Sequence, residues 1–155
     1  MTKTNAMRLL DAAKIAYEVK EYTVDENDLS GVHIASQIGL PFDQVFKTLT
    51  ARGDKTGVIV FCIPVHKEID LKKAAAITGN KRVELLAVKE LLGVTGYVRG
   101  GCSPIGMKKK FPTFIEESAL NFERITVSAG MKGAQLLLRV DELLTFTGAT
   151  LCQIV

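Results

Sequence analysis

The sequence predicts an α/β fold, a single domain over residues 1–155 in which short helices surround a curled, mixed and largely antiparallel sheet or a barrel. The 155 residues are 47% hydrophobic and 24% charged, which is enough apolar material for one hydrophobic core and argues against disorder. Segments with strand and helix periodicity alternate without a regular strand–helix–strand rhythm. Hairpin-like connections between several strands favour antiparallel pairing.

The N-terminal third begins with a helix that Thr4 or Asn5 caps and that extends to about residue 16. Residues 17–22 (YEVKEY) alternate between apolar and polar side chains, which is typical of a strand. The elements expected next are a polar loop at 23–30, a helix at 31–38 that ends at Gly39, and a helical turn that Pro41 opens.

A β-hairpin is expected near the middle of the chain. Residues 47–51 and 57–65 have strand character, and the sequence RGDKTG between them supplies turn residues. The second segment, GVIVFCIPV, is almost entirely apolar. It should therefore form a central strand that is buried on both faces.

The remaining chain predicts further short elements. Asp70 caps a helix over LKKAAAIT that Gly79 ends. The elements that follow in chain order are a strand or extended piece at 81–87, a helical turn at 88–92 ended by Gly93, strands at 113–117, 124–128 and 135–139, a helix at 140–147 and a last apolar segment at 149–155. The sequence SAGMKG should form a tight turn after the strand at 124–128.

Charge and cysteine content limit the classes of function. The formal net charge is +3, which permits an acidic partner such as RNA without requiring one. The three cysteines are widely spaced and form no CxxC pattern, so we expect neither structural zinc nor a disulfide framework, and a reducing, cytoplasmic location fits best. The N-terminus lacks a signal-peptide pattern and no apolar run reaches membrane-spanning length, so we expect no membrane partner.

Residues 96–112 (GYVRGGCSPIGMKKKFP) combine four glycines with a Ser-Pro step and three consecutive lysines. Gly100 and Gly101 carry no Cβ, so the backbone can approach a ligand closely there. Glycine-rich backbone beside cationic side chains suits an anionic or highly polar ligand. A surface loop with a solvated basic tail is the alternative interpretation.

The sequence lacks the usual catalytic motifs. The two histidines, His33 and His66, belong to no HExxH or HxxxH pattern. There is no GxSxG elbow and no GxxxxGK[ST] loop, and GVTGYVRGG does not have the context of a dinucleotide-binding fingerprint. We therefore expect no metal and no cofactor.

Four side chains are individual candidates for a site. Lys47 lies at the seam between a helical turn and a strand, where its ammonium can point into a cleft; a surface lysine is equally compatible. Cys102 has no evident base for a nucleophilic thiol, so a small residue filling a turn is the better interpretation. Ser128 precedes a glycine turn and Tyr22 ends the first strand, and each can line a pocket or simply pack.

Several motifs in this order closely resemble the YbaK/EbsC family. They are VFKTL, an apolar strand with IPV, IDLKKAA, KRVELL, TGYVRGGCSPIG with KKKFP, and ITVSAGMKG. Members of this family are free-standing bacterial editing proteins, best known as Cys-tRNA(Pro) deacylases, and are similar to the editing domain of bacterial prolyl-tRNA synthetases. The resemblance covers essentially the whole chain and implies a pocket that receives the aminoacylated 3′ end of a tRNA.

The resemblance also implies roles for individual residues. Catalytic positions are Lys47, Gly101 and Ser128. The positions implied to contact substrate are Tyr22, Ser30, Gly100, Cys102, Ser103, Pro104, Gly106, Gly130 and Gln135, and the lysines implied to face RNA are Lys108, Lys109 and Lys110. Some members have a phenylalanine where this chain has Ser30 and an aspartate where it has Gln135, so the choice of substrate remains open.

In cysteine-specific members the thiol of the substrate attacks its own ester carbonyl and releases a thiolactone, so the resemblance implies a site without a protein nucleophile. The implied partners are aminoacyl-tRNA rather than DNA, and prolyl-tRNA synthetase. The oligomeric state is open between monomer and homodimer. Two alternatives remain: a deacylase for another small residue such as alanine on tRNA(Pro), and a non-catalytic RNA-binding or regulatory module.

Overall fold

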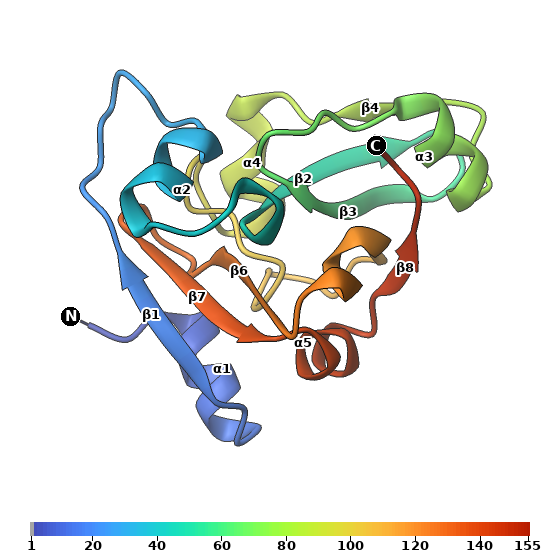
Figure 1. The fold of residues 1–155 in the computed structure, drawn as a ribbon. Coiled ribbons are helices and arrows are strands. Elements are labelled where there is room, and N and C mark those ends of the chain that lie inside the picture. Colours follow the sequence, from blue (N-terminus) through green and yellow to red (C-terminus); the bar gives the residue numbers. More distant parts are fainter. Residues whose placement is uncertain (1) are drawn as a thin grey trace.

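The computed structural model describes residues 2–155 as an α/β fold with two packed sheets (Figure 1). The helices are α1 (Asn5–Ala12), α2 (Gly31–Ile38), α3 (Leu71–Thr78), α4 (Val88–Thr95) and α5 (Val140–Thr147), with short 3-10 helices η1 (Phe42–Gln44) and η2 (Glu117–Asn121). The strands are β1 (Tyr17–Glu21), β2 (Phe46–Gly53), β3 (Gly57–Pro64), β4 (Val83–Leu85), β5 (Thr113–Glu116), β6 (Arg124–Ser128), β7 (Ala134–Arg139) and β8 (Thr150–Cys152). The predicted α/β class is confirmed.

The strands divide between a small antiparallel sheet and a larger mixed one. The small sheet has the order β1-β7-β6, and the larger sheet has the order β4-β2-β3-β5-β8. In the larger sheet β2 pairs antiparallel with β3 and β4, whereas β3–β5 and β5–β8 are parallel. The two sheets meet at one parallel bridge between Val45 and Thr126. Val45 lies between η1 and β2, so this bridge places the start of β2 beside the middle of β6.

β3 is the central strand that its apolar sequence predicts. It lies between β2 and β5, and its residues 59–64 are buried. One apolar cluster packs α3 against β2 and β3, and a second packs α1 and α5 against the small sheet. In Figure 1, α1 and α5 lie beside β1, β7 and β6, while α3 lies at the far end of the hairpin. These two clusters therefore fix the positions of the start of β2, the end of β6 and the start of β7.

The capping signals were predicted correctly for two helices. Thr4 Oγ1 accepts a hydrogen bond from the Met7 N–H at the start of α1, and Asp70 caps α3 through the Lys72 and Lys73 N–H groups. Ser30, which was expected only as the end of a polar loop, caps α2 through the His33 N–H. Left-handed glycines end α2 and α3, as expected. The position of α2 matters for the site, because it places Ser30 near the start of β2.

The ends of two helices were predicted wrongly, and one short helix was missed. α1 ends at Ala12 instead of about residue 16, because Lys14 adopts a positive φ of 59° and turns the chain towards β1. α4 continues through Gly93 to Thr95, since one glycine inside a helix costs only about 1 kcal/mol and Gly96, with φ of 86°, is the residue that ends it. The 3-10 helix η2 was not anticipated. Within residues 2–155, no helix is both long and apolar enough to cross a membrane.

Candidate functional site

A cavity of about 300 Å³ lies between α2, the glycine-rich loop (residues 96–112) and the ends of three strands. These are the start of β2, the end of β6 and the start of β7. The residues that line it come from segments far apart in the sequence: Leu29, Ser30, Gly31, Ile34, Val45, Phe46, Lys47, Thr48, Leu49, Val65, Arg99, Gly100, Cys102, Ser128 and Gln135. Six of them had been singled out from the sequence. The lining has two cations, and none of these fifteen residues carries a carboxylate.

Lys47 is positioned by the β-hairpin. It is the second residue of β2 and pairs with Ile63 of β3, which is fully buried. The side chain is half-buried, and this burial lowers the pKa of the ammonium, an effect that the charge of Glu68 partly opposes. No ion pair formed within residues 2–155 includes Lys47. Its charge is therefore available to a ligand in the cavity.

The glycine pair shapes the cavity wall in two different ways. Gly100 has a φ of 86°, in the region that side chains rarely adopt. A Cβ on Gly101 would lie 3.1 Å from the backbone of Met131 and Lys132, so glycine allows the two turns to pack more closely than a larger residue would. The Gly101 N–H donates to the Val98 carbonyl at 3.0 Å and is already occupied. Among residues 2–155, the Gly100 and Cys102 N–H groups have no hydrogen-bond partner and remain as donors.

Ser128 and Gln135 contribute two polar side chains to the cavity lining. They are register partners on β6 and β7, and both are buried. Ser128 Oγ accepts a hydrogen bond from the Gly130 N–H at 3.2 Å, which leaves the hydroxyl proton free to donate. Gln135 Oε1 accepts from the Thr126 hydroxyl at 3.3 Å. The side-chain amide of Gln135 is thus held in place while its NH₂ group has no partner among residues 2–155.

Cys102 lines the cavity, but its thiol is not poised for nucleophilic attack. The side chain is buried, and Sγ lies 3.8 Å from Thr50 Oγ1. Burial raises the pKa of the thiol, so the reactive thiolate is disfavoured. This agrees with the interpretation of Cys102 as a packing residue whose backbone, rather than its sulfur, faces a ligand.

Other predicted positions lie away from this cavity. Tyr22 borders a smaller adjoining hollow together with Gly100. Ser103 is fully buried, and its hydroxyl accepts a hydrogen bond from the Ile105 N–H at 3.2 Å. Gly130, with φ of 95°, packs against the ring of Tyr97. These residues fix the shape of the loops that form the wall.

The second half of the glycine-rich loop runs away from the cavity. Pro104, Gly106, Lys109 and Lys110 border a separate hollow of about 210 Å³ beside α5. Lys108 Nζ donates to the Gly93 carbonyl at 3.3 Å, near the end of α4. The structure therefore does not bring these predicted contacts together with Lys47.

Sequence reasoning missed Thr48 and Arg99 as lining residues. Thr48 follows Lys47 directly, and strand alternation predicts that the two side chains point to opposite faces of β2, so no local pattern marks Thr48 as a lining residue. Arg99 precedes the glycine pair, and a cation beside two adjacent glycines is the signal that could have identified it. Its side chain is exposed at the edge of the cavity.

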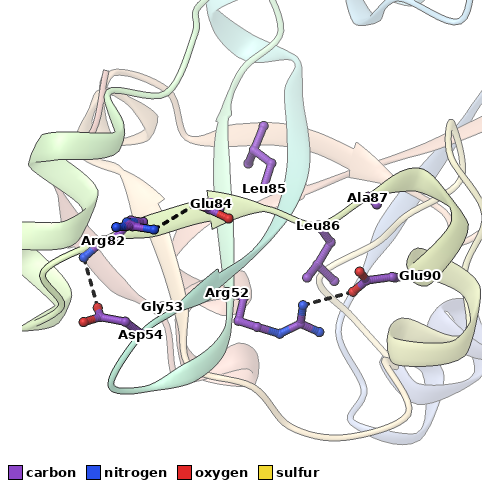
Figure 2. A pocket seen from close by; sticks show the side chains of 9 residues that line it. All are labelled: Arg52, Gly53, Asp54, Arg82, Glu84, Leu85, Leu86, Ala87 and Glu90. Carbon is purple, nitrogen blue, oxygen red and sulfur yellow. Dashed lines mark hydrogen bonds and ion pairs between the residues drawn. The ribbon is translucent and has the colours of Figure 1, made fainter.

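A larger cavity, of about 480 Å³, lies at the other end of β2 (Figure 2). Its cations are already compensated: Arg52 pairs with Glu90 at 3.0 Å and Arg82 with Glu84 at 3.7 Å. Asp54 in the same wall accepts hydrogen bonds from the Arg82 and Lys81 N–H groups. Figure 2 shows the two arginines pointing to these carboxylates and not to the open space. The smaller cavity is therefore the better candidate for an anionic ligand.

No group of three or more His, Cys, Asp or Glu side chains among residues 2–155 is arranged to hold a metal ion. The polar groups around the cavity are instead an ammonium, a guanidinium, a hydroxyl, a carboxamide and backbone N–H donors. Groups of this kind bind the neutral oxygens of carbonyls and hydroxyls and the charged oxygens of phosphates.

Comparison with known proteins is consistent with the fold. The sequence model of the aminoacyl-tRNA editing domain matches residues 30–146, and the chain belongs to this family. An Enterococcus faecalis protein, EbsC, is 45% identical over 152 residues, covering 98% of this chain and 93% of the relative; it is named as a candidate Cys-tRNA(Pro)/Cys-tRNA(Cys) deacylase. The uncharacterized protein YwhH of Bacillus subtilis is 27% identical over 131 residues, 83% of each chain.

A solved structure supports the same architecture. The crystal structure of a candidate trans-editing enzyme for prolyl tRNA synthetase aligns with a TM-score of 0.83 over 99% of this chain and 98% of that one. The two sequences are 23% identical, so this likeness concerns the fold alone.

Proposed function

We propose that this chain is an aminoacyl-tRNA deacylase that removes cysteine from mischarged Cys-tRNA(Pro). The observation that carries the proposal is the cavity that gathers Ser30, Lys47, Gly100, Ser128 and Gln135 in a member of the editing-domain family. The resemblance had marked all five from the sequence alone. The relative at 45% identity is named for the same reaction.

The size and polarity of the cavity suit the aminoacylated ribose. About 300 Å³ is at the lower end of small-molecule sites, which fits one aminoacyl-ribose and excludes a stretch of nucleotides. Lys47 holds a hydroxyl of the ribose or the ester carbonyl through its partly desolvated ammonium. Ser128 donates its remaining proton to an oxygen of the substrate, and the NH₂ group of Gln135 faces the amino-acid side chain.

The chemistry proceeds without a nucleophile from the protein. The thiol of the cysteinyl group attacks its own ester carbonyl, so that an S–C bond forms and the C–O bond to the ribose breaks. The thiol proton ends on the departing ribose oxygen, and the products are a thiolactone and free tRNA. The site contributes by holding thiol and carbonyl in contact, which can be worth about 7 kcal/mol or more.

Negative charge that develops on the carbonyl oxygen needs donors that are already in place. The unoccupied N–H groups of Gly100 and Cys102 supply them on one wall, and Lys47 supplies a positive charge nearby. Gly101 contributes indirectly, since its missing Cβ is what allows this wall to pack.

A deacylation panel tests the proposal. Purified protein is incubated with tRNA(Pro) carrying cysteine, serine, alanine or proline, and with Cys-tRNA(Cys). Cysteinyl esters should be cleaved fastest, and serine, which replaces the thiol by a hydroxyl, should react far more slowly. Equal rates on alanine and cysteine would instead support hydrolysis by water. Binding of tRNA without cleavage of any ester would rule out the enzyme and leave an RNA-binding module.

The proposal extends to the surroundings of the reaction. The whole chain forms one editing domain, acts in the cytoplasm where tRNA is charged, and encounters its substrate at or near prolyl-tRNA synthetase. Lys109 and Lys110 border a hollow outside the cavity and attract the RNA backbone without sequence specificity. Retention of tRNA(Pro) on immobilised protein, with and without the synthetase, measures these interactions.

A further inference from the structure

Arg99 is the exposed cation of the cavity lining, and, like the half-buried Lys47, it has no carboxylate partner among residues 2–155. None of the ion pairs within residues 2–155 includes Arg99. Lys132, which packs against Gly100, is paired with Glu26 at 3.2 Å. Asp28, which lies in the same loop as Glu26, is 3.8 Å from His33 Nδ1. The charge of Arg99 is thus left available at the edge of the cavity.

The backbone holds Arg99 at a fixed place. It is the middle residue of a turn that the Gly101 N–H closes onto the Val98 carbonyl at 3.0 Å. Gly101 is pressed against the Met131–Lys132 backbone, so this turn is braced from behind. An exposed guanidinium on a braced turn loses less conformational freedom on binding than one on a flexible tail.

The two cations of the cavity differ in what they can bind. Lys47 is half-buried, so its ammonium is partly desolvated, and this burial lowers its pKa. A neutral ribose or ester oxygen costs less to desolvate at that position than a charged phosphate does. Arg99 remains in water, carries a permanent charge and presents a planar fork, which matches two oxygens of a phosphate.

We propose that Arg99 binds the phosphodiester that joins the terminal adenosine of the tRNA to the preceding nucleotide. This inference rests on the proposed function, because the aminoacyl-ribose must occupy the cavity for that phosphate to lie at its edge. Arg99 is a substrate-binding residue that sets the depth to which the 3′ end enters. It reads no base, so its contribution is the same for every tRNA.

The experiment compares Arg99→Gln with Arg124→Gln on two substrates. Arg124 is also an exposed arginine, but it pairs with Glu18 at 3.3 Å and starts β6, four residues before Ser128. Loss of either arginine changes the net charge equally. The substrates are Cys-tRNA(Pro) and 3′-O-cysteinyl-adenosine, which has the same ester and no phosphate.

Arg99→Gln should raise KM for Cys-tRNA(Pro) about tenfold with little change in kcat, as expected for a charge-assisted contact. KM for cysteinyl-adenosine should stay unchanged, and Arg124→Gln should alter neither. The slope of log KM against log salt concentration should fall by about 0.7 in Arg99→Gln, the value for one single-strand phosphate contact. Arg99→Lys should recover part of the loss.

Two results overturn the inference. One is an Arg99→Gln variant with unchanged KM on Cys-tRNA(Pro); the other is an equal loss on both substrates, which would place Arg99 at the ester. Failure of the proposed function looks different, since the wild-type protein would then cleave neither substrate. In that case binding of uncharged tRNA(Pro) still decides the role of Arg99, because Arg99→Gln should weaken it about tenfold and Arg124→Gln should not.

Discussion

Ser128 on β6 lies directly opposite Gln135 on β7, and both side chains line the cavity that contains Lys47. The turn between them, residues 129–133, also packs against Gly101. One tight β-hairpin therefore supplies two polar side chains and supports the wall that carries the free N–H donors. Changes in these residues should separate effects on catalysis from effects on folding.

Replacing Lys47 by methionine should lower the deacylation rate by about 10²-fold or more, because a charge next to the developing oxyanion is lost. The same change should not destabilise the fold, since methionine occupies a half-buried position without the cost of desolvating a charge. The measurements are single-turnover deacylation and thermal denaturation. Full activity in Lys47→Met would remove this residue from the site.

The pH dependence of stability offers a second test of the Lys47 environment. Its folded-state pKa is lowered by burial, so the unfolded chain binds more protons between the folded and unfolded pKa values. Stability of the wild type relative to Lys47→Met should accordingly increase as pH rises through that interval below 10.5. A difference between the two proteins that is constant from pH 7 to 10.5 would contradict the inferred burial.

Cys102→Ala should keep deacylation within a few-fold of the wild type, because the thiol is buried and its pKa is raised. Iodoacetamide should label native Cys62 and Cys152 slowly as well, since burial raises their pKa values to about 12 and about 11. All three should react once the protein is unfolded. If Cys102→Ala lost all activity with an unchanged melting temperature, the Cys102 thiol would be assigned a nucleophilic role.

Gln135→Ala should reduce stability by about 1 kcal/mol, because the buried Thr126 hydroxyl loses its acceptor. Adding Thr126→Val should recover most of that loss, since neither partner is then unpaired. In both variants the ratio of cysteine to alanine deacylation should change, whereas Thr126→Val alone should preserve it. An unchanged ratio would show that Gln135 does not face the amino-acid side chain.

Gly101→Ala should destabilise the protein by about 1–3 kcal/mol, because the new methyl group meets backbone atoms at 3.1 Å. Gly100→Ala should cost roughly 1–2 kcal/mol, through its φ of 86° alone. Chemical denaturation measures both. Gly57→Ala is the matched control: its φ is 77° with open space around it, and it lies in the hairpin turn far along the chain from the cavity.

The sequence by itself determined most of the elements and the family. Apolar alternation, the capping residues Thr4 and Asp70, and left-handed glycines are local signals, and they placed strands and helices correctly. Gly93 misled because a single glycine costs a helix little, while the residue that ends α4 is identified by its backbone angle. The order of motifs also pointed to the editing-domain family, which the comparison confirmed.

Only the tertiary structure decided which of the marked residues share a cavity. Lys47, Arg99 and Ser128 are brought together by strand pairing and by the packing of one turn on another, and sequence spacing carries no information about either. The same packing buries Ser103, turns Pro104 and Gly106 away, and occupies the N–H of Gly101. Whether a cation is compensated depends on carboxylates far along the chain, and for that reason only the folded protein shows that Arg99 lines the cavity without an ion-pair partner among residues 2–155.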